Sequence, residues 1–134
     1  MIPFRLVFEP GISLYEQVVY AAKKAVVSGQ MRPGEAFPSV RALSKALKIN
    51  PNTAHKVITQ LLNDGLLESQ PGVGTVVADL PRSTATQRTD LLGQQIEELV
   101  VEAKRLSIPL EDVTDAIDRH WNRLTSRRNQ GEPE

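Results

Sequence analysis

Polar side chains, most of them neutral groups that both donate and accept hydrogen bonds, gather on one face of a helix predicted over residues 51–63. They are Asn52, Thr53, His55, Lys56, Thr59, Gln60 and Asn63. A solvated helix face is more often rich in Glu and Lys, so this composition indicates contact with another polar surface. The opposite face must pack on a core, because its apolar residues recur at helical spacing. They are Ala54, Val57, Ile58, Leu61 and Leu62.

Positive charge is concentrated around the same stretch. Arg41, Lys45, Lys48 and Lys56 lie within residues 36–63, which contain no acidic residue, although the chain as a whole carries 16 basic and 16 acidic residues. Such a local excess of cations suits a polyanion such as nucleic acid. The alternative interpretation is that these charges only solubilise a core-packed helical pair.

Two helices joined by a tight turn are predicted to position these groups. Ser39 can cap a short first helix, and Asn50 can cap the second, with Pro51 at its first helical position. Gly65 can end the second helix in the left-handed conformation. The signals together predict a helix-turn-helix.

A small β-hairpin follows these helices. Residues 66–70 and 75–78 favour short strands, and Gly72 and Gly74 supply the backbone freedom that a tight turn requires. The turn is not followed by Lys-Ser/Thr and leads into a strand, so a nucleotide-binding loop is not indicated. The order of elements predicts a winged helix-turn-helix.

The N-terminal segment supplies the remaining elements of this domain. Residues 2–8 are apolar and β-leaning and favour a short edge strand. Ser13 and Glu16 fit a capping box for a helix that runs to about Ser28, with Gly29 as its C-cap.

Length and composition limit the class of protein. With 134 residues and 40% apolar residues, the chain is one domain or a small domain with an appendage. It has no Cys, so disulfides, thiolate metal sites and cysteine nucleophiles are excluded. Neither a signal peptide nor an apolar run long enough for a membrane is evident, so we expect a cytoplasmic protein without membrane contact.

The C-terminal part predicts a helical hairpin. We divide the chain into residues 1–80, a winged domain; 81–89, a linker or helix start; 90–126, two amphipathic helices; and 127–134, a disordered tail. The fold class is therefore mainly α with a small β wing. Residues 1–80 carry a net charge of +2 (eight basic, six acidic) and residues 81–134 one of −2 (eight basic, ten acidic).

Two amphipathic helices cannot bury both apolar stripes by packing only on each other. A second copy of the chain is the simplest cover, which predicts a two-fold homodimer. Folding back onto the winged domain is the alternative. The predicted interface residues are Leu92, Ile96, Leu99, Val100, Ala103, Leu110, Val113, Ile117, Trp121 and Leu124.

The stretch PGEAFPSVRALSKALKINPNTAHKVITQLLNDGLLESQPGVGTVV resembles the winged helix-turn-helix of the GntR family of bacterial transcription regulators. The PGE…PS.R.L segment, the NPNT helix start and the G.GT.V wing all match. With only two helices predicted after the wing, the chain is similar to the small YtrA-like subfamily. The resemblance covers about residues 13–77.

The resemblance implies roles for individual residues. Ser39 and Arg41, at the PS.R positions, would hold the DNA backbone and reach toward bases. Gly72 and Gly74 would shape a wing tip along the minor groove or its phosphates. The residues that would enter the major groove are Asn52, Thr53, His55 and Lys56.

Physical chemistry agrees with these roles. Cations at Arg41, Lys45, Lys48 and Lys56 would supply salt-dependent phosphate contacts. An Asn side chain can pair with adenine through two hydrogen bonds, and a Thr methyl can contact the thymine methyl. A two-fold dimer would read an inverted repeat in double-stranded DNA.

The chain departs from the family pattern at three positions. Many members carry Arg where this chain has Pro51 and His55, and a polar or basic wing residue where it has Val73. We therefore expect base recognition to depend mainly on Asn52, with a smaller cationic contribution from each recognition helix.

No enzymatic site is predicted. His55 and His120 lie far apart in the sequence and no metal-ligand spacing is present. Asp112, Asp115 and Asp118 could hold a divalent cation, but they are better explained as a solvated helix face. We expect no catalysis, metal or cofactor.

Fewer than sixty residues follow the wing, and two helices leave little room for an enclosed metabolite pocket of about 300 Å³ or more. Either there is no small-molecule effector, or a ligand binds at the dimer interface near His120 and Trp121. These two side chains are more often simple packing residues.

The sequence thus predicts a dimeric DNA-binding transcription regulator, and more specifically a repressor. The alternative is a winged-helix module that binds another protein and reads no specific DNA.

Overall fold

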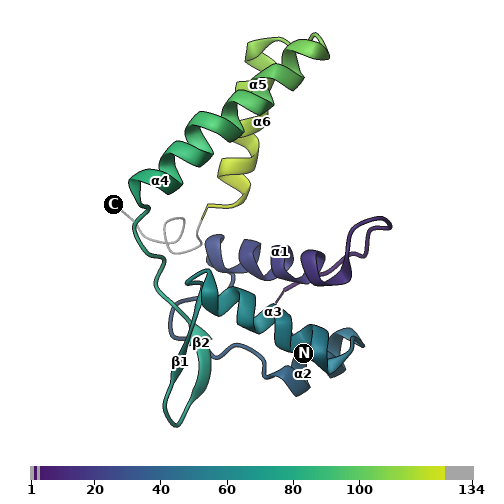
Figure 1. The fold of residues 1–134 in the computed structure, drawn as a ribbon, viewed down its shortest axis with the longest axis vertical. Coiled ribbons are helices and arrows are strands. Elements are labelled where there is room, and N and C mark those ends of the chain that lie inside the picture. The colour runs from purple at the N-terminus through teal and green to yellow at the C-terminus, as the bar shows by residue number, and fades with distance from the viewer. Residues whose placement is uncertain (1, 3, 126–134) are drawn as a thin grey trace. The chain divides into compact units, whose positions relative to one another are not determined.

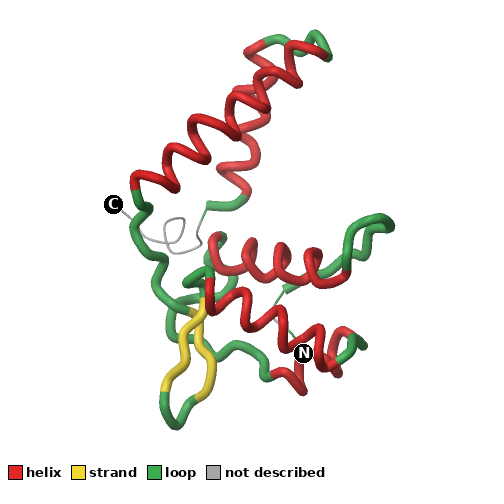
Figure 2. Tube along the Cα trace, in the orientation of Figure 1, coloured by secondary structure: helices red, strands yellow, loops and turns green. Residues whose placement is uncertain are grey.

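The computed structural model describes residues 2 and 4–125, and it divides the chain into two compact units. We call the first unit, which comprises Met1–Leu80 and also takes in Leu124 and Thr125, the winged-helix unit, and we call Pro81–Arg123 the hairpin unit. The chain is mainly helical with one two-stranded antiparallel sheet, which confirms the predicted fold class (Figures 1 and 2). Within the described residues, no helix is both long enough and apolar enough to span a membrane.

Three helices form the body of the winged-helix unit: α1 (Leu14–Val27), α2 (Val40–Leu47) and α3 (Pro51–Asn63). α3 packs against both α1 and α2 and lies between them in Figure 1. The predicted stripe of α3 faces the core, with four of its five residues buried and Leu62 half-buried.

The start of α1 is fixed by two side chains. Ser13 Oγ accepts a hydrogen bond from the Glu16 N–H at 3.1 Å, which is one of the two bonds of the predicted capping box. The return bond to the Glu16 side chain is not formed among the described residues, so the predicted capping box is only half confirmed. The second partner is Gln17, whose amide accepts from the Glu9 N–H at 2.7 Å and donates to the carbonyl oxygens of Glu9 and Ile12. These bonds fasten the preceding turn to the helix.

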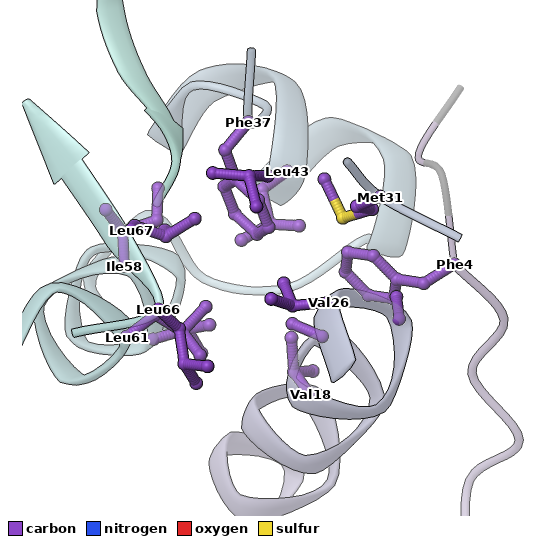
Figure 3. Close-up of a cluster of buried hydrophobic side chains, with 14 of the residues drawn as sticks. Phe4, Val18, Val26, Met31, Phe37, Leu43, Ile58, Leu61, Leu66 and Leu67 are labelled. Atoms are coloured by element: carbon purple, nitrogen blue, oxygen red, sulfur yellow. The ribbon is translucent and has the colours of Figure 1, made fainter. Parts of the chain in front are cut away.

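The core of the winged-helix unit lies between its helices and the wing (Figure 3). Met31, Leu43 and Leu61 are its largest fully buried side chains. The phenyl ring of Phe4 stacks on that of Phe37 with 6.1 Å between centroids. This contact joins the N-terminal segment to the loop before α2.

The predicted edge strand over residues 2–8 is wrong for the described residues, which pair with no strand. The segment is held instead by side chains, since Phe4 is buried and Leu6 half-buried. The outer edge of β2 is already bonded to residues 34–37, and the packing of Phe4 on Phe37 holds the segment without strand pairing.

The wing consists of β1 (Leu67–Gln70) and β2 (Gly74–Val77), paired antiparallel with Gln70 opposite Gly74. The other edge of β2 bonds to residues 34–37, a pairing that the sequence did not predict. The Phe37 N–H donates to the Thr75 carbonyl at 2.8 Å, and the Val77 N–H to the Glu35 carbonyl at 2.8 Å. β2 is thus held along both sides.

The first helix of the hairpin unit begins earlier than Asp90. It comprises α4 (Ala85–Arg88), a π-helical segment η1 (Thr89–Gln95) and α5 (Ile96–Arg105). Thr84 and Gln87 form a reciprocal capping box at its start. The predicted region 81–89 therefore contains a helix start.

The second helix, α6, spans Leu110–Arg123. Ser107 takes a left-handed conformation (φ +57°) between the helices, and the Ile108 N–H donates back to the Ala103 carbonyl at 2.9 Å. The Pro109 carbonyl accepts from the Asp112 N–H at 3.1 Å, which starts α6 as predicted. The predicted tail, residues 127–134, lies outside the described residues.

Candidate nucleic-acid interface

The first turn of α3 presents an asparagine, Asn52, whose side chain takes no part in capping the helix. Asn50 supplies the cap, since its Oδ1 accepts from the Asn52 N–H at 2.8 Å, and Pro51 occupies the first turn. The Asn52 side chain is exposed, and no hydrogen bond among the described residues uses it. Its donor and acceptor are therefore available together, as pairing with an adenine edge requires.

The other predicted base-contacting residues lie on the same half of α3. His55 and Lys56 are exposed, and they follow Asn52 at helical spacings that place all three on one face. Thr53 is half-buried, so only part of its side chain can reach a partner. The structure brings these four residues together on one outward surface.

Gln60, further along the same polar face, has an internal role. The Tyr15 hydroxyl donates to Gln60 Oε1 at 2.9 Å, and Gln60 Nε2 donates to Asp64 Oδ1 at 2.9 Å. The prediction that the polar face as a whole awaits an external partner is therefore wrong at Gln60. This side chain links α3 to α1, and the outward surface is confined to the N-terminal half.

α2 contributes a cap and a cationic face. Ser39 Oγ accepts from the Ala42 N–H at 3.1 Å, which leaves the hydroxyl proton for another acceptor. Arg41 and Lys45 are exposed and lie one helical turn apart. Lys48 follows in a left-handed conformation (φ +56°), which ends α2 at the turn before α3.

The cations of α2 and α3 form no ion pair with any residue that the structure describes. In the part of the chain that the structure describes, the one ion pair joins Arg105 to Glu102 in the hairpin unit. That carboxylate raises the pKa of Arg105 above its ordinary value. Arg41, Lys45 and Lys56, in contrast, project into solvent with their charges uncompensated, which suits an external polyanion.

The wing turn has the backbone geometry that its glycines predict. The Val73 N–H donates to the Gln70 carbonyl at 3.1 Å and closes the turn. Gly72 and Gly74 have φ values of +79° and +109°, which strongly favour glycine. Both glycines act through the backbone, and the exposed side chain between them is Val73.

Most of the predicted dimer stripe is exposed on the hairpin unit. Ala103 is buried, Val113 is half-buried, and Leu124 lies just after the last residue of α6. The exposed members are Leu92, Ile96, Leu99, Val100, Leu110, Ile117 and Trp121. The two helices therefore leave a large apolar surface in contact with water.

A groove of about 490 Å³ runs between α5 and α6. Leu99, Ala103, Val113 and Ile117 line it, and His120 stands at its side. Trp121 is not among the lining residues and is 76% exposed. Of the two residues considered for a ligand site, only His120 thus adjoins the groove.

Known proteins resemble the chain in the region that holds these side chains. The family described as bacterial regulatory proteins, gntR family, matches residues 14–77. The chain is also 30% identical over 105 residues to the HTH-type transcriptional repressor YtrA of Bacillus subtilis (strain 168). The aligned region covers 78% of this chain and 81% of that relative. The chain belongs to the GntR family. It is a transcription regulator, and the relatives carry regulator names and no enzyme name, in agreement with the expected absence of catalysis.

Solved structures show the same fold as this GntR-family chain. A transcriptional antiterminator from Listeria monocytogenes EGD-e has a TM-score of 0.77 over 90% of this chain and 91% of its own, at 22% identity. YtrA from Sulfolobus acidocaldarius, a GntR-family transcription factor, has a TM-score of 0.52 over 89% and 97%, at 21% identity. Both likenesses extend beyond the winged-helix unit.

Proposed function

We propose that the chain is a dimeric repressor that reads an inverted-repeat operator in double-stranded DNA. In this proposal α3 enters the major groove, the wing lies against the neighbouring minor groove, and the hairpin unit joins two copies. The protein would act in the cytoplasm. Repression is suggested by the Bacillus subtilis relative, which is named a transcriptional repressor.

The DNA-binding part of the proposal rests on one observation. Free hydrogen-bonding groups and uncompensated positive charge lie together on the same two helices, α2 and α3. Within the residues that the structure describes, the exposed Asn52 side chain makes no hydrogen bond, and Arg41, Lys45 and Lys56 make no ion pair. Phosphate contacts supply affinity and register, whereas base-edge contacts supply sequence preference. Because this surface has both cations and free hydrogen-bonding groups, it can supply both affinity for DNA and sequence preference.

In this proposal, Ser39 and α2 contact the DNA backbone, and α3 contacts mainly the bases. The Ser39 hydroxyl proton, Arg41 and Lys45 suit phosphate oxygens, since all three offer donors on α2 or its cap. Asn52 suits an adenine edge, and Thr53 and His55 adjoin it. Lys56 would add a further phosphate contact.

The dimer part of the proposal is supported by the exposed apolar surface of the hairpin unit. Leu99 and Ile117 line the groove between α5 and α6 and are 42% and 43% exposed. A second copy of the same surface would cover both. Two recognition helices would then contact half-sites about 34 Å, or one helical turn of DNA, apart.

The test is selection of bound sequences from a random duplex pool at about 0.15 M salt, followed by affinity measurements across salt concentrations. An inverted repeat should be recovered. Lys45→Gln should flatten the salt dependence, whereas Lys23→Gln, an exposed charge on α1, should not. Recovery of no enriched sequence, with little duplex affinity, would favour a protein-binding module.

A further inference from the structure

The tip of the wing is apolar and exposed. Val73 lies in the turn between β1 and β2, and 63% of its surface is accessible. A Cβ added at Gly72 or Gly74 would meet no atom within 4 Å, so the space beside the tip is open. The hairpin also projects beyond the helices of its own unit (Figure 1). The Val73 isopropyl group thus stands between two positions without side chains, where a flat partner can approach closely.

The wing has no positive charge. From residue 66 to residue 78 the chain contains one charged side chain, that of Glu68, which is exposed. Positive charge lies instead at Arg41 and Lys45 on α2, Lys48 in the turn, Lys56 on α3, and Arg32 in the loop before α2. The wing therefore cannot attract phosphates by charge, and its outermost group suits an apolar surface.

The minor groove of DNA supplies such a surface. Its walls are sugars, and apolar side chains are known to enter it. On its floor, G·C pairs differ from A·T pairs by the exocyclic amino group of guanine, which is a hydrogen-bond donor. An isopropyl group offers no acceptor for that donor, and close contact would leave it unsatisfied. An A·T pair lacks the protruding group and leaves room.

We propose that Val73 is a specificity-determining residue that selects A·T pairs beneath the wing by excluding the guanine amino group. The inference rests on the proposed function, because it requires a bound operator. In this inference the wing recognises the shape of the minor groove, while α2 and α3 supply the positive charge and the hydrogen bonds to DNA.

The test uses the full chain and the operator recovered by selection. Each A·T pair is replaced in turn by diaminopurine·T, which adds the amino group to the minor groove and leaves the major-groove edge unchanged. Each G·C pair is replaced by inosine·C, which removes that group. Diaminopurine beneath the wing should weaken binding roughly fivefold or more, the usual scale for one wrong pair. The same replacements at base pairs that α3 contacts in the major groove should leave the affinity unchanged.

Diaminopurine also alters the stiffness of the duplex. The decisive measurement is therefore whether the loss of affinity that diaminopurine causes depends on the Val73 side chain. Val73→Ala should reduce the diaminopurine effect to about twofold or less, since the smaller side chain clears the amino group. Val7→Ala removes the same atoms from an 80% exposed residue outside the wing and should keep the full effect. Equal sensitivity in Val73→Ala and the native chain would overturn the assignment.

A charge substitution tests the same position with ordinary DNA. Val73→Arg should steepen the salt dependence of binding by about one unit of slope per wing, because the new cation meets phosphates. Val7→Arg should not. An unchanged slope in Val73→Arg would place the wing away from DNA and overturn the inference. If selection recovers no operator at all, the proposed function fails and this inference fails with it.

Discussion

The two units of this chain bury apolar surface very differently. Of the nineteen buried apolar residues in the described chain, eighteen belong to the winged-helix unit, and Ala103 alone belongs to the hairpin unit. The winged-helix unit has a core of its own, in which seven large side chains are almost fully buried. The hairpin unit exposes large residues such as Leu110 and Trp121.

This difference indicates where each unit obtains its stability. Burial of apolar side chains is the main favourable contribution to folding. The winged-helix unit obtains it within one chain, so its stability should not depend on chain concentration. The hairpin unit can obtain it only by covering its exposed face, which by our proposal a second copy does, so its stability should rise with concentration.

The largest effect should come from the core of the winged-helix unit. Leu61 is fully buried on α3, so Leu61→Ala should lower the free energy of unfolding by about 2–5 kcal/mol through lost burial and a residual cavity. Urea denaturation followed by circular dichroism at several chain concentrations measures it. Val7→Ala, at an exposed position, is the control. A loss that varied with concentration would break the distinction between the units.

The next effect concerns the hairpin unit. Leu99 is 42% exposed and lines the groove between α5 and α6. Leu99→Glu would place a charge in the proposed dimer interface, so dimers should dissociate and operator affinity should fall by about tenfold or more. Sedimentation velocity and duplex titration measure the two losses.

Val101→Glu is the matched control for this substitution. Val101 lies on α5, is 60% exposed and falls off the predicted stripe. The control should keep both the dimer and the operator affinity. An intact dimer in Leu99→Glu would remove this face from the interface, and the comparison between the units would need another explanation.

A smaller effect tests whether recognition resides in the winged-helix unit alone. Asn52→Ala should weaken binding to the selected operator by about 1–3 kcal/mol and change binding to unrelated DNA little. The dimer should persist, because the substitution lies outside the hairpin unit. Competition titrations against both duplexes measure the preference. Equal losses on both would contradict base readout by Asn52.

A still smaller effect addresses the bond between α1 and α3. Tyr15→Phe removes the donor to Gln60 and should lower the free energy of unfolding by about 1 kcal/mol. Operator preference should stay the same, because Gln60 lies in the C-terminal half of α3, away from the outward surface of its first turns. A changed preference in equilibrium binding, without a change in stability, would assign Gln60 to the DNA surface instead.

The smallest effects should be stabilising. Lys48 and Ser107 both adopt positive φ at helix ends, one in each unit. Exchange for glycine should remove about 1–2 kcal/mol of backbone strain at each position. The greater freedom of glycine in the unfolded chain offsets about 0.5–1 kcal/mol of this, which leaves a small net gain in stability. Thermal unfolding should show a concentration-independent gain for Lys48→Gly and, for Ser107→Gly, a gain in the concentration-dependent transition. Destabilisation by either exchange would mean that the native side chain makes a contact that outweighs the strain.

Local signals made α3 and the wing predictable from sequence. Asn50, Pro51 and Gly65 mark the ends of α3 within a few residues of themselves, and the structure places each at its predicted position. The start of α4 was equally readable, because Thr84 and Gln87 have capping-box spacing. The structure shows the second of the two predicted alternatives for residues 81–89, a helix start.

The features that were missed depend on partners distant in sequence. The N-terminal segment has β-leaning residues, but the stacking of Phe4 on Phe37 decides where it lies. Gln60 looks available for an external partner until Tyr15, 45 residues away, is placed beside it. The π-helical turns of η1 had no recognised signal in the sequence.

The two-sided bonding of β2 has a thermodynamic consequence for recognition. Backbone bonds tie β2 to β1 on one side and to residues 34–37 on the other, and Ser39 caps α2 two residues further on. The wing and the helix start are thus ordered before any partner arrives. A preorganised surface loses little conformational entropy on association, so more of its contact energy remains as affinity. Slow amide exchange at Val77 in the free protein would be the signature of that rigidity.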